Sequence, residues 1–150
     1  METPVDENAN KYLSFFLEDV SYVIPIRNVT EIIGMQRVSQ VPGSDRAMRG
    51  VINLRGRVIP IMDVRLRFGL PERAYNDRTC IVVIQVGGTS VGLVVDTVSD
   101  VMDIHEPLEP ASTMGTHNAD SCVAGFGRAE GDIRVVLDPE LLVQGVRSAA

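Results

Sequence analysis

Apolar runs of strand length, separated by short polar turns, recur along the whole chain. Each pair of runs predicts a β-hairpin, and the pairs lie at 12–26, 50–63, 79–96 and 123–137. The clearest is 79–96, where Gly87-Gly88 separates two runs rich in β-branched residues. The apolar positions at 98–102 continue as strand. Because no long helical pattern alternates with these strands, we predict a mainly β fold of antiparallel small barrels rather than a parallel α/β sheet.

Short helical patterns lie between or after the hairpins. Residues 29–33 place apolar side chains at helical spacing, which predicts a turn or two of helix with Glu31 on the opposite face. Residues 44–50 start with a serine cap and end with glycine, which predicts a second short helix. Asp63 can cap a short turn at 63–69. At 138–143, an aspartate cap, a proline at the first helical position and an apolar face predict a C-terminal helix.

A weak internal repeat indicates two lobes within one domain. Residues 58–64 resemble residues 92–98, since both end an apolar strand with aspartate, one further residue and an apolar side chain. The sequence therefore favours a lobe boundary near residue 77, with lobe 1 at roughly 12–76 and lobe 2 at roughly 77–143. Residues 1–10 read as a polar leader, and the proline-containing stretch 107–120 reads as a surface loop.

The hairpin at 50–63 carries the candidate binding surface. Its turn, Asn53-Leu54-Arg55-Gly56, presents Arg55 and Arg57 beside the apolar run 58–62. A guanidinium with apolar neighbours is typical of binding surfaces, because it offers five fixed donors while its neighbours exclude water. The ordinary interpretation is that these arginines are solvated and the apolar run is core. Pro60 cannot donate to a strand ladder, which predicts a sheet edge or a bulge in the second arm.

Charge is concentrated in the same region. The chain has a net charge of −6, yet residues 46–78 contain eight bases, all arginine, and three acids, for a segment charge of 8 − 3 = +5. An arginine-only patch on an acidic protein favours recognition of carboxylates or of a protein surface. The net charge weighs against wholesale binding to nucleic acid or to acidic membranes. No apolar run is long enough to span a membrane and the N-terminus lacks signal-peptide features, so we predict a cytoplasmic protein.

Residue types that form metal or catalytic sites are present without the spacing that those sites require. The two histidines lie far apart, three acids do not follow a calcium-loop order, and the two cysteines read as small buried residues. There is no phosphate loop, nucleotide fingerprint or nucleophile elbow. We therefore expect no catalytic residue, no metal and no cofactor. These histidines, acids and cysteines are His105, His117, Asp96, Asp100, Asp103, Cys80 and Cys122.

Several separated motifs follow one another along the chain. They are Tyr22-Val23-Ile24-Pro25-Ile26, Val29-Thr30-Glu31-Ile32, Val51-Ile52-Asn53-Leu54-Arg55-Gly56, Ile59-Pro60-Ile61-Met62-Asp63-Val64-Arg65, Val91-Gly92-Leu93-Val94-Val95-Asp96, Val98-Ser99-Asp100-Val101 and Gly125-Phe126-Gly127. Together and in this order, they resemble the motifs of the CheW-like domain family of bacterial chemotaxis coupling proteins. The resemblance covers roughly residues 11–145.

This resemblance implies two SH3-like five-stranded barrels with a shared apolar core, in an adaptor without catalysis. Such an adaptor couples the cytoplasmic tips of chemoreceptors to the regulatory domain of the histidine kinase CheA, controls kinase activity and is recruited to membrane receptor arrays. The kinase-facing surface is implied only as loops at the barrel ends. The receptor contacts that the resemblance implies are Val29, Glu31, Gly50, Asn53, Arg55, Gly56, Gly92 and Val101.

A second hypothesis remains open from the residues alone. Small barrels can bind single-stranded nucleic acid, and the arginine-rich segment 46–78 could serve that purpose. Such a site needs aromatic side chains on which bases stack, and only Phe68 and Tyr75 are near. Within the adaptor class, the sequence leaves open whether the pathway drives swimming or another output.

Overall fold

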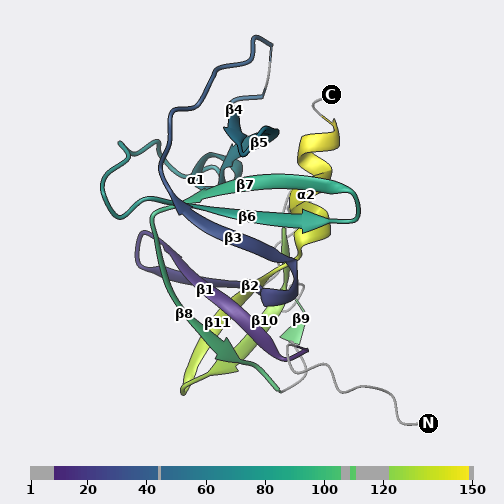
Figure 1. The fold of residues 1–150 in the computed structure, drawn as a ribbon. Coiled ribbons are helices and arrows are strands. Elements are labelled where there is room, and N and C mark those ends of the chain that lie inside the picture. The colour runs from purple at the N-terminus through teal and green to yellow at the C-terminus, as the bar shows by residue number, and fades with distance from the viewer. Residues whose placement is uncertain (1–8, 44, 106–108, 111–121, 149–150) are drawn as a thin grey trace, which may run out of the picture.

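Two β-sheets form the body of the molecule in the computed structural model, which describes residues 9–43, 45–105, 109–110 and 122–148. Figure 1 shows one sheet lying above the other, with the C-terminal helix α2 (Pro139–Ser148) beside them. The mainly β prediction is confirmed. The five-stranded sheet has the order β3 (Val29–Gly34), β6 (Cys80–Val86), β7 (Thr89–Val95), β5 (Arg57–Asp63) and β4 (Met48–Leu54). The six-stranded sheet has the order β8 (Thr97–Asp103), β1 (Lys11–Leu17), β2 (Val20–Pro25), β11 (Asp132–Leu137), β10 (Val123–Ala129) and β9 (Glu109–Pro110).

All four predicted hairpins are present: β1–β2, β4–β5, β6–β7 and β10–β11. Their turns use the backbone conformations that the sequence signals require. Arg55 and Gly56 have φ angles of 53° and 84°, and Glu130 and Gly131 have φ angles of 53° and 82°. Two successive positive φ values are the geometry of two-residue turns whose twist matches that of the flanking strands. Local turn chemistry therefore fixes these pairings.

The strand order corrects the expected division into sequential lobes near residue 77. The five-stranded sheet is built from residues 29–95, so it spans the expected boundary, whereas the six-stranded sheet combines strands from both ends of the chain. Two pairs are parallel, β2 with β11 and β5 with β7, so the sheets are not wholly antiparallel. Each parallel pair joins two different hairpins. Such long-range pairing has no local turn signal that a hairpin search could find.

Three apolar clusters fill the structure, and the largest lies between the two sheets. This shared core takes side chains from β1, β2, β6, β7 and α2, which confirms the expectation of two lobes with a common apolar core. A second cluster lies within the five-stranded sheet and a third within the six-stranded sheet. The fully buried members of the shared core include Phe15, Ile24, Val82, Ile84, Val64 and Leu142.

Two of the predicted short helices are wrong and the C-terminal helix is confirmed. Residues 29–34 form strand β3 after one 3-10 turn, η1 (Ile26–Asn28), and β4 begins at Met48 inside the predicted 44–50 helix. A short apolar run does not distinguish strand from helix, and here pairing with β6 and β5 decides. In α2 (Pro139–Ser148), the Asp138 carboxylate accepts a hydrogen bond from the Glu140 amide at 2.9 Å. The Asp138 cap is therefore in place.

Other expectations fall at the limits of the described residues. Residues 1–8 and most of the predicted loop at 107–120 lie outside them, and the described part of that loop, Glu109–Pro110, forms β9. Cys122 is buried as expected and Cys80 is half-buried, and neither forms a disulfide. Among the described residues, no helix is long and apolar enough to cross a membrane.

Gly92 occupies a position in β7 that has no room for a side chain. A Cβ atom there would lie 2.6 Å from Ile61 Cδ1 and 2.8 Å from Ile81 Cγ2. We expect Gly92→Ala to lower the free energy of unfolding by about 1–2 kcal/mol through overpacking, measured by urea denaturation. Gly88→Ala is the matched control, since nothing lies within 4 Å of its Cβ position; it should change stability by less than about 0.5 kcal/mol. Equal effects of the two substitutions would contradict the packing argument.

Candidate functional site

The turn of the β4–β5 hairpin holds Arg55 at an exposed tip. The Asn53 side-chain oxygen accepts a hydrogen bond from the Gly56 amide at 2.9 Å, which closes the turn. Gly56 adopts a positive φ of 84° that favours glycine. Asn53 and Gly56 therefore shape the turn, and the side chain of Arg55, 71% exposed, extends from it.

Arg55 is paired with Glu31 of β3 through its Nη2 atom and the Glu31 Oε2 atom. Because β3 and β4 are the two edges of the five-stranded sheet, this ion pair joins opposite edges. Ile33 of β3 and Leu54 of β4 also pack against the same apolar cluster, so the sheet curls enough to bring its two edges within reach of this ion pair. Sequence reasoning named both charged residues but placed Glu31 on a helix, so it did not foresee their contact.

The surface around Arg55 has the mixed character that the sequence predicts. The guanidinium of Arg57 donates to the Ser90 hydroxyl at 3.2 Å, and Val58 exposes most of its side chain. In contrast, Ile59, Ile61 and Met62 are buried and belong to the core, as the ordinary interpretation has it. On this arm, only the first two residues of β5, Arg57 and Val58, therefore remain candidates for a binding surface.

Pro60 does not mark a sheet-edge strand, because β5 lies between β4 and β7. Its pairing with β7 begins only at Ile61, opposite Gly92. Residues 57–60 pair with β4 alone. The proline thus occupies the half of the strand that has one neighbour, which is where a missing amide donor costs least.

The remaining residues that the resemblance implies do not gather at Arg55. Val29 is half-buried and packs against the shared core. Gly50 and Gly92 are buried, and a Cβ at Gly50 would collide with the Ser39 carbonyl oxygen. Val101 is exposed on β8, at an edge of the other sheet. The structure therefore brings Glu31, Asn53, Arg55 and Gly56 together, while the two buried glycines act through backbone shape.

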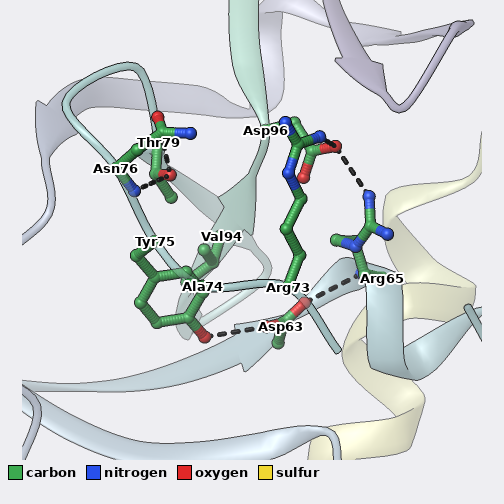
Figure 2. Close-up of a pocket in the computed structure, with 9 residues that line it drawn as sticks. All are labelled: Asp63, Arg65, Arg73, Ala74, Tyr75, Asn76, Thr79, Val94 and Asp96. Atoms are coloured by element: carbon green, nitrogen blue, oxygen red, sulfur yellow. Dashed lines mark hydrogen bonds and ion pairs between the residues drawn. The ribbon is translucent and has the colours of Figure 1, made fainter. Parts of the chain in front are cut away.

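A buried charge network that the sequence reasoning missed links the two sheets. The Arg65 side chain, only 5% exposed, donates from Nη1 to the Asp96 carboxylate at 2.8 Å and from Nη2 to the Glu18 carboxylate at 2.5 Å. Its Nε donates to the Pro71 carbonyl at 3.1 Å. Glu18 lies in the β1–β2 turn and Asp96 lies between β7 and β8, so one guanidinium joins both sheets. Figure 2 shows Arg65 and Asp96 directed toward each other.

The Arg65 cation is held in its charged form by this network. Burial lowers the pKa of Arg65, but the hydrogen bonds and negative charges of Glu18 and Asp96 outweigh burial and raise it above the ordinary value. Arg73 provides a second cation on the same Asp96 oxygen at 3.2 Å, from an exposed position. The charges of Arg65, which is buried, and of Asp96, which is half-buried, are therefore both paired. We assign Arg65 a structural role, which is to hold the two sheets together.

Asp63 caps α1 (Val64–Arg67), as the sequence predicts, and also binds Tyr75. Its Oδ1 accepts hydrogen bonds from the amides of Arg65 at 3.0 Å and Leu66 at 3.4 Å, and its Oδ2 accepts the Tyr75 hydroxyl at 2.7 Å. Burial, followed by the hydrogen bond and the charge of Asp63, raises the pKa of Tyr75 above its ordinary value. Figure 2 shows the Tyr75 hydroxyl directed at Asp63. The hydrogen bond from Tyr75 therefore links the connector at residues 70–79 to the residue that caps α1.

Tyr75→Phe is expected to remove an alkaline dependence of stability. Because the folded pKa of Tyr75 lies above the unfolded value of 10.0, the neutral phenol contributes stability that is complete below that value and is lost as the pH rises through the folded pKa. Urea unfolding at pH of about 8 and about 11 should show a larger loss of stability in the parent protein than in Tyr75→Phe. The pKa of Tyr22 is also raised, but Tyr22 is present in both proteins and contributes equally to both losses. Equal losses of stability in the two proteins would therefore contradict the role of Tyr75.

The two aromatic side chains of the arginine-rich segment, Phe68 and Tyr75, make contacts within the protein. The Phe68 ring lies 5.4 Å from the Tyr22 ring, against the shared core. Tyr75 is held by Asp63, and the Arg49 guanidinium lies 5.9 Å from its ring centre. Phe68 thus packs inside the protein, and Tyr75 is held by its hydroxyl with Arg49 near its ring, so these two residues give the nucleic-acid hypothesis no support. Among the described residues, no three of His, Cys, Asp and Glu gather as metal ligands.

Comparisons with known proteins agree with these motifs. The family model described as "CheW-like domain" matches residues 11–147. A chemotaxis protein CheW of Klebsiella aerogenes is 32% identical over 140 residues, which are 93% of this chain and 84% of that protein. A chemotaxis protein CheW of Bacillus subtilis is 37% identical over 100 residues, 67% of this chain and 64% of that protein.

A solved structure has the same fold. The scaffolding protein TtCheW from Thermoanaerobacter tengcongensis superimposes with a TM-score of 0.78 and 27% sequence identity, covering 86% of this chain and 88% of that one. The family model spans nearly the whole chain, and its range includes both members of the Glu31–Arg55 pair. The chain belongs to the CheW-like domain family.

Proposed function

We propose that this chemotaxis coupling adaptor bridges the cytoplasmic tips of chemoreceptors and the regulatory domain of the histidine kinase CheA, without catalysis of its own. Its relatives are named as chemotaxis proteins and as a scaffolding protein. The adaptor works in the cytoplasm and is recruited to receptor arrays at the membrane. The observation that carries the proposal is the exposed Arg55 of the family motif, held at a hairpin tip beside Glu31 and Val58.

This arrangement suits a helical partner such as a receptor tip. The Arg55 guanidinium can donate to carboxylates on a helix face or to the free carbonyls at a helix end. Val58 adds an exposed apolar contact on the same hairpin. Because Glu31 already binds Arg55, a partner carboxylate either shares the guanidinium or replaces Glu31. The proposed receptor site therefore comprises the hairpin tip and the adjoining edge of β3.

The other implied contacts belong to the same proposal with different roles. Gly50 and Gly92 shape the backbone on either side of β5, and Val29 orients the start of β3. Val101 lies on the other sheet, so it would contact a different part of the receptor. The kinase surface is assigned to no particular residue.

Kinase reconstitution tests the function directly. Autophosphorylation of CheA is measured with membranes that contain receptor, in the presence and absence of this protein. We expect receptor-dependent control of the kinase only when the protein is present. A kinase that follows the receptor state equally well without it would overturn the proposal. Omitting receptor while keeping the protein is the control, since an adaptor alone supplies no signal.

A further inference from the structure

The six-stranded sheet opens between β2 and β11. These two strands pair in parallel at only two positions, Tyr22 with Val135 and Val23 with Val136. Before this pairing, Val20–Ser21 of β2 and Asp132–Arg134 of β11 face a groove that runs between them. Figure 1 shows the turn of the β10–β11 hairpin reaching away from the β1–β2 hairpin. The two strands therefore have unpaired backbone on the sides that face the groove.

Apolar side chains line this opening. Val20 is 46% exposed and Ile133 is 59% exposed, and they stand on opposite sides of the groove. Phe16 also lines it, half-buried, and belongs to none of the three apolar clusters. Exposed branched side chains beside an aromatic ring are the features that gain most from being covered by a partner.

The charges around the groove are predominantly negative, and the one positive side chain that lines it, Arg134, is 13% exposed. Asp19 and Asp132 line the groove at its two hairpin ends, and Glu130 lies next to it. Arg134 is the only base among the lining residues. Its Nη2 atom lies 3.9 Å from the carboxylates of Glu130 and Asp132, and its buried Nε has no hydrogen-bond partner within the described part of the chain. With two aspartates and one arginine, the residues that line the groove have a net negative charge.

We propose that an extended segment of a partner protein, with apolar side chains flanked by lysine or arginine, docks between β2 and β11. Its apolar side chains cover Val20 and Ile133, and its basic side chains meet Asp19 and Asp132. Addition of an extended segment to open strand backbone is a common mode of peptide recognition. This surface lies on the six-stranded sheet, away from the sheet that carries Arg55, and goes beyond the proposed coupling site.

Backbone amide signals of the 150-residue chain report on this site in an NMR titration. The probe is a short synthetic peptide of alternating valine and lysine, and its counterpart has glutamate in place of every lysine. We expect the lysine peptide to shift the signals of Val20, Ser21, Ile133 and Arg134, and the glutamate peptide to leave them unchanged. The double variant Asp19→Lys, Asp132→Lys should bind the lysine peptide with an affinity that is lower by about tenfold or more.

Two further variants test whether the peptide binds at this groove. Ile133→Ser, at an exposed position, should weaken binding of the lysine peptide while thermal unfolding stays unchanged. Arg55→Ala should leave the peptide affinity as it is, because that residue lies on the other sheet. The inference is overturned if the lysine peptide shifts no signal at the groove, if both peptides bind equally, or if the double variant binds as the parent does.

Discussion

Replacement of Arg65 by methionine is expected to lower the free energy of unfolding by about 3 kcal/mol. Removing one partner of a buried ion pair typically costs about 3–5 kcal/mol, since the other partner remains buried and uncompensated. The lower end applies here because Asp96 keeps Arg73 as a second partner. Methionine fills a similar volume without a charge. Urea denaturation with two-state analysis measures the change.

Arg73→Met is the matched control for this prediction. Both arginines donate to Asp96 Oδ2, Arg65 at 2.8 Å and Arg73 at 3.2 Å, but the Arg73 side chain is 53% exposed against 5% for Arg65. An exposed partner is screened by water and contributes about 0–1 kcal/mol. If the two substitutions destabilise the protein equally, burial of Arg65 is not the source of its contribution.

The hairpins could be predicted from the sequence because each is encoded within a few residues. The Gly87-Gly88 turn and the Arg55-Gly56 turn both need backbone conformations that particular residues supply. The Asp63 and Asp138 caps are local in the same sense, since each accepts hydrogen bonds from amides two or three residues further on. The turns and caps could therefore be predicted, whereas the local patterns at 29–33 and 44–50 predicted helices where β3 and β4 form.

The arrangement of those hairpins depends on contacts that no local pattern contains. β11 returns from the end of the chain to lie beside β2, and β5 lies beside β7, both in parallel. The repeat at 58–64 and 92–98 suggests one strand from each of two sequential lobes. In the structure, these residues begin in β5 and β7, which are neighbours in one sheet. Burial of both faces of the five-stranded sheet selects this order, and single-strand periodicity does not report on it.

The candidate site shows the same division. The presentation of Arg55 at a turn could be predicted from Asn53 and Gly56. Its pairing with Glu31 depends on the curl of the whole sheet, which brings β3 and the β4–β5 turn close to each other. The Arg65 network was missed because its members lie far apart in sequence. One signal was available: Arg65 stands between Val64 and Leu66 directly after a buried strand, where a solvated arginine is not expected.

Arg55→Ala is expected to weaken binding of a receptor-tip fragment by about 2 kcal/mol or more, roughly thirtyfold in dissociation constant, as the loss of a central anchor does. The fold should be unaffected, because the side chain is exposed and the turn is closed by Asn53 and Gly56 rather than by the guanidinium. Calorimetric titration of the receptor fragment measures the affinity, and thermal unfolding verifies the fold.

Two variants identify the reason for that loss. Arg57→Ala removes the same charge from the same hairpin, where the guanidinium bonds to Ser90, and it should reduce affinity far less than Arg55→Ala. Arg55→Lys keeps the charge but not the planar fork of donors, so it should restore only part of the affinity. Equal losses for Arg55→Ala and Arg57→Ala would show that net charge attracts the receptor. Full recovery with lysine would show that bidentate geometry is not needed. Unchanged affinity in Arg55→Ala would remove the hairpin tip from the receptor interface.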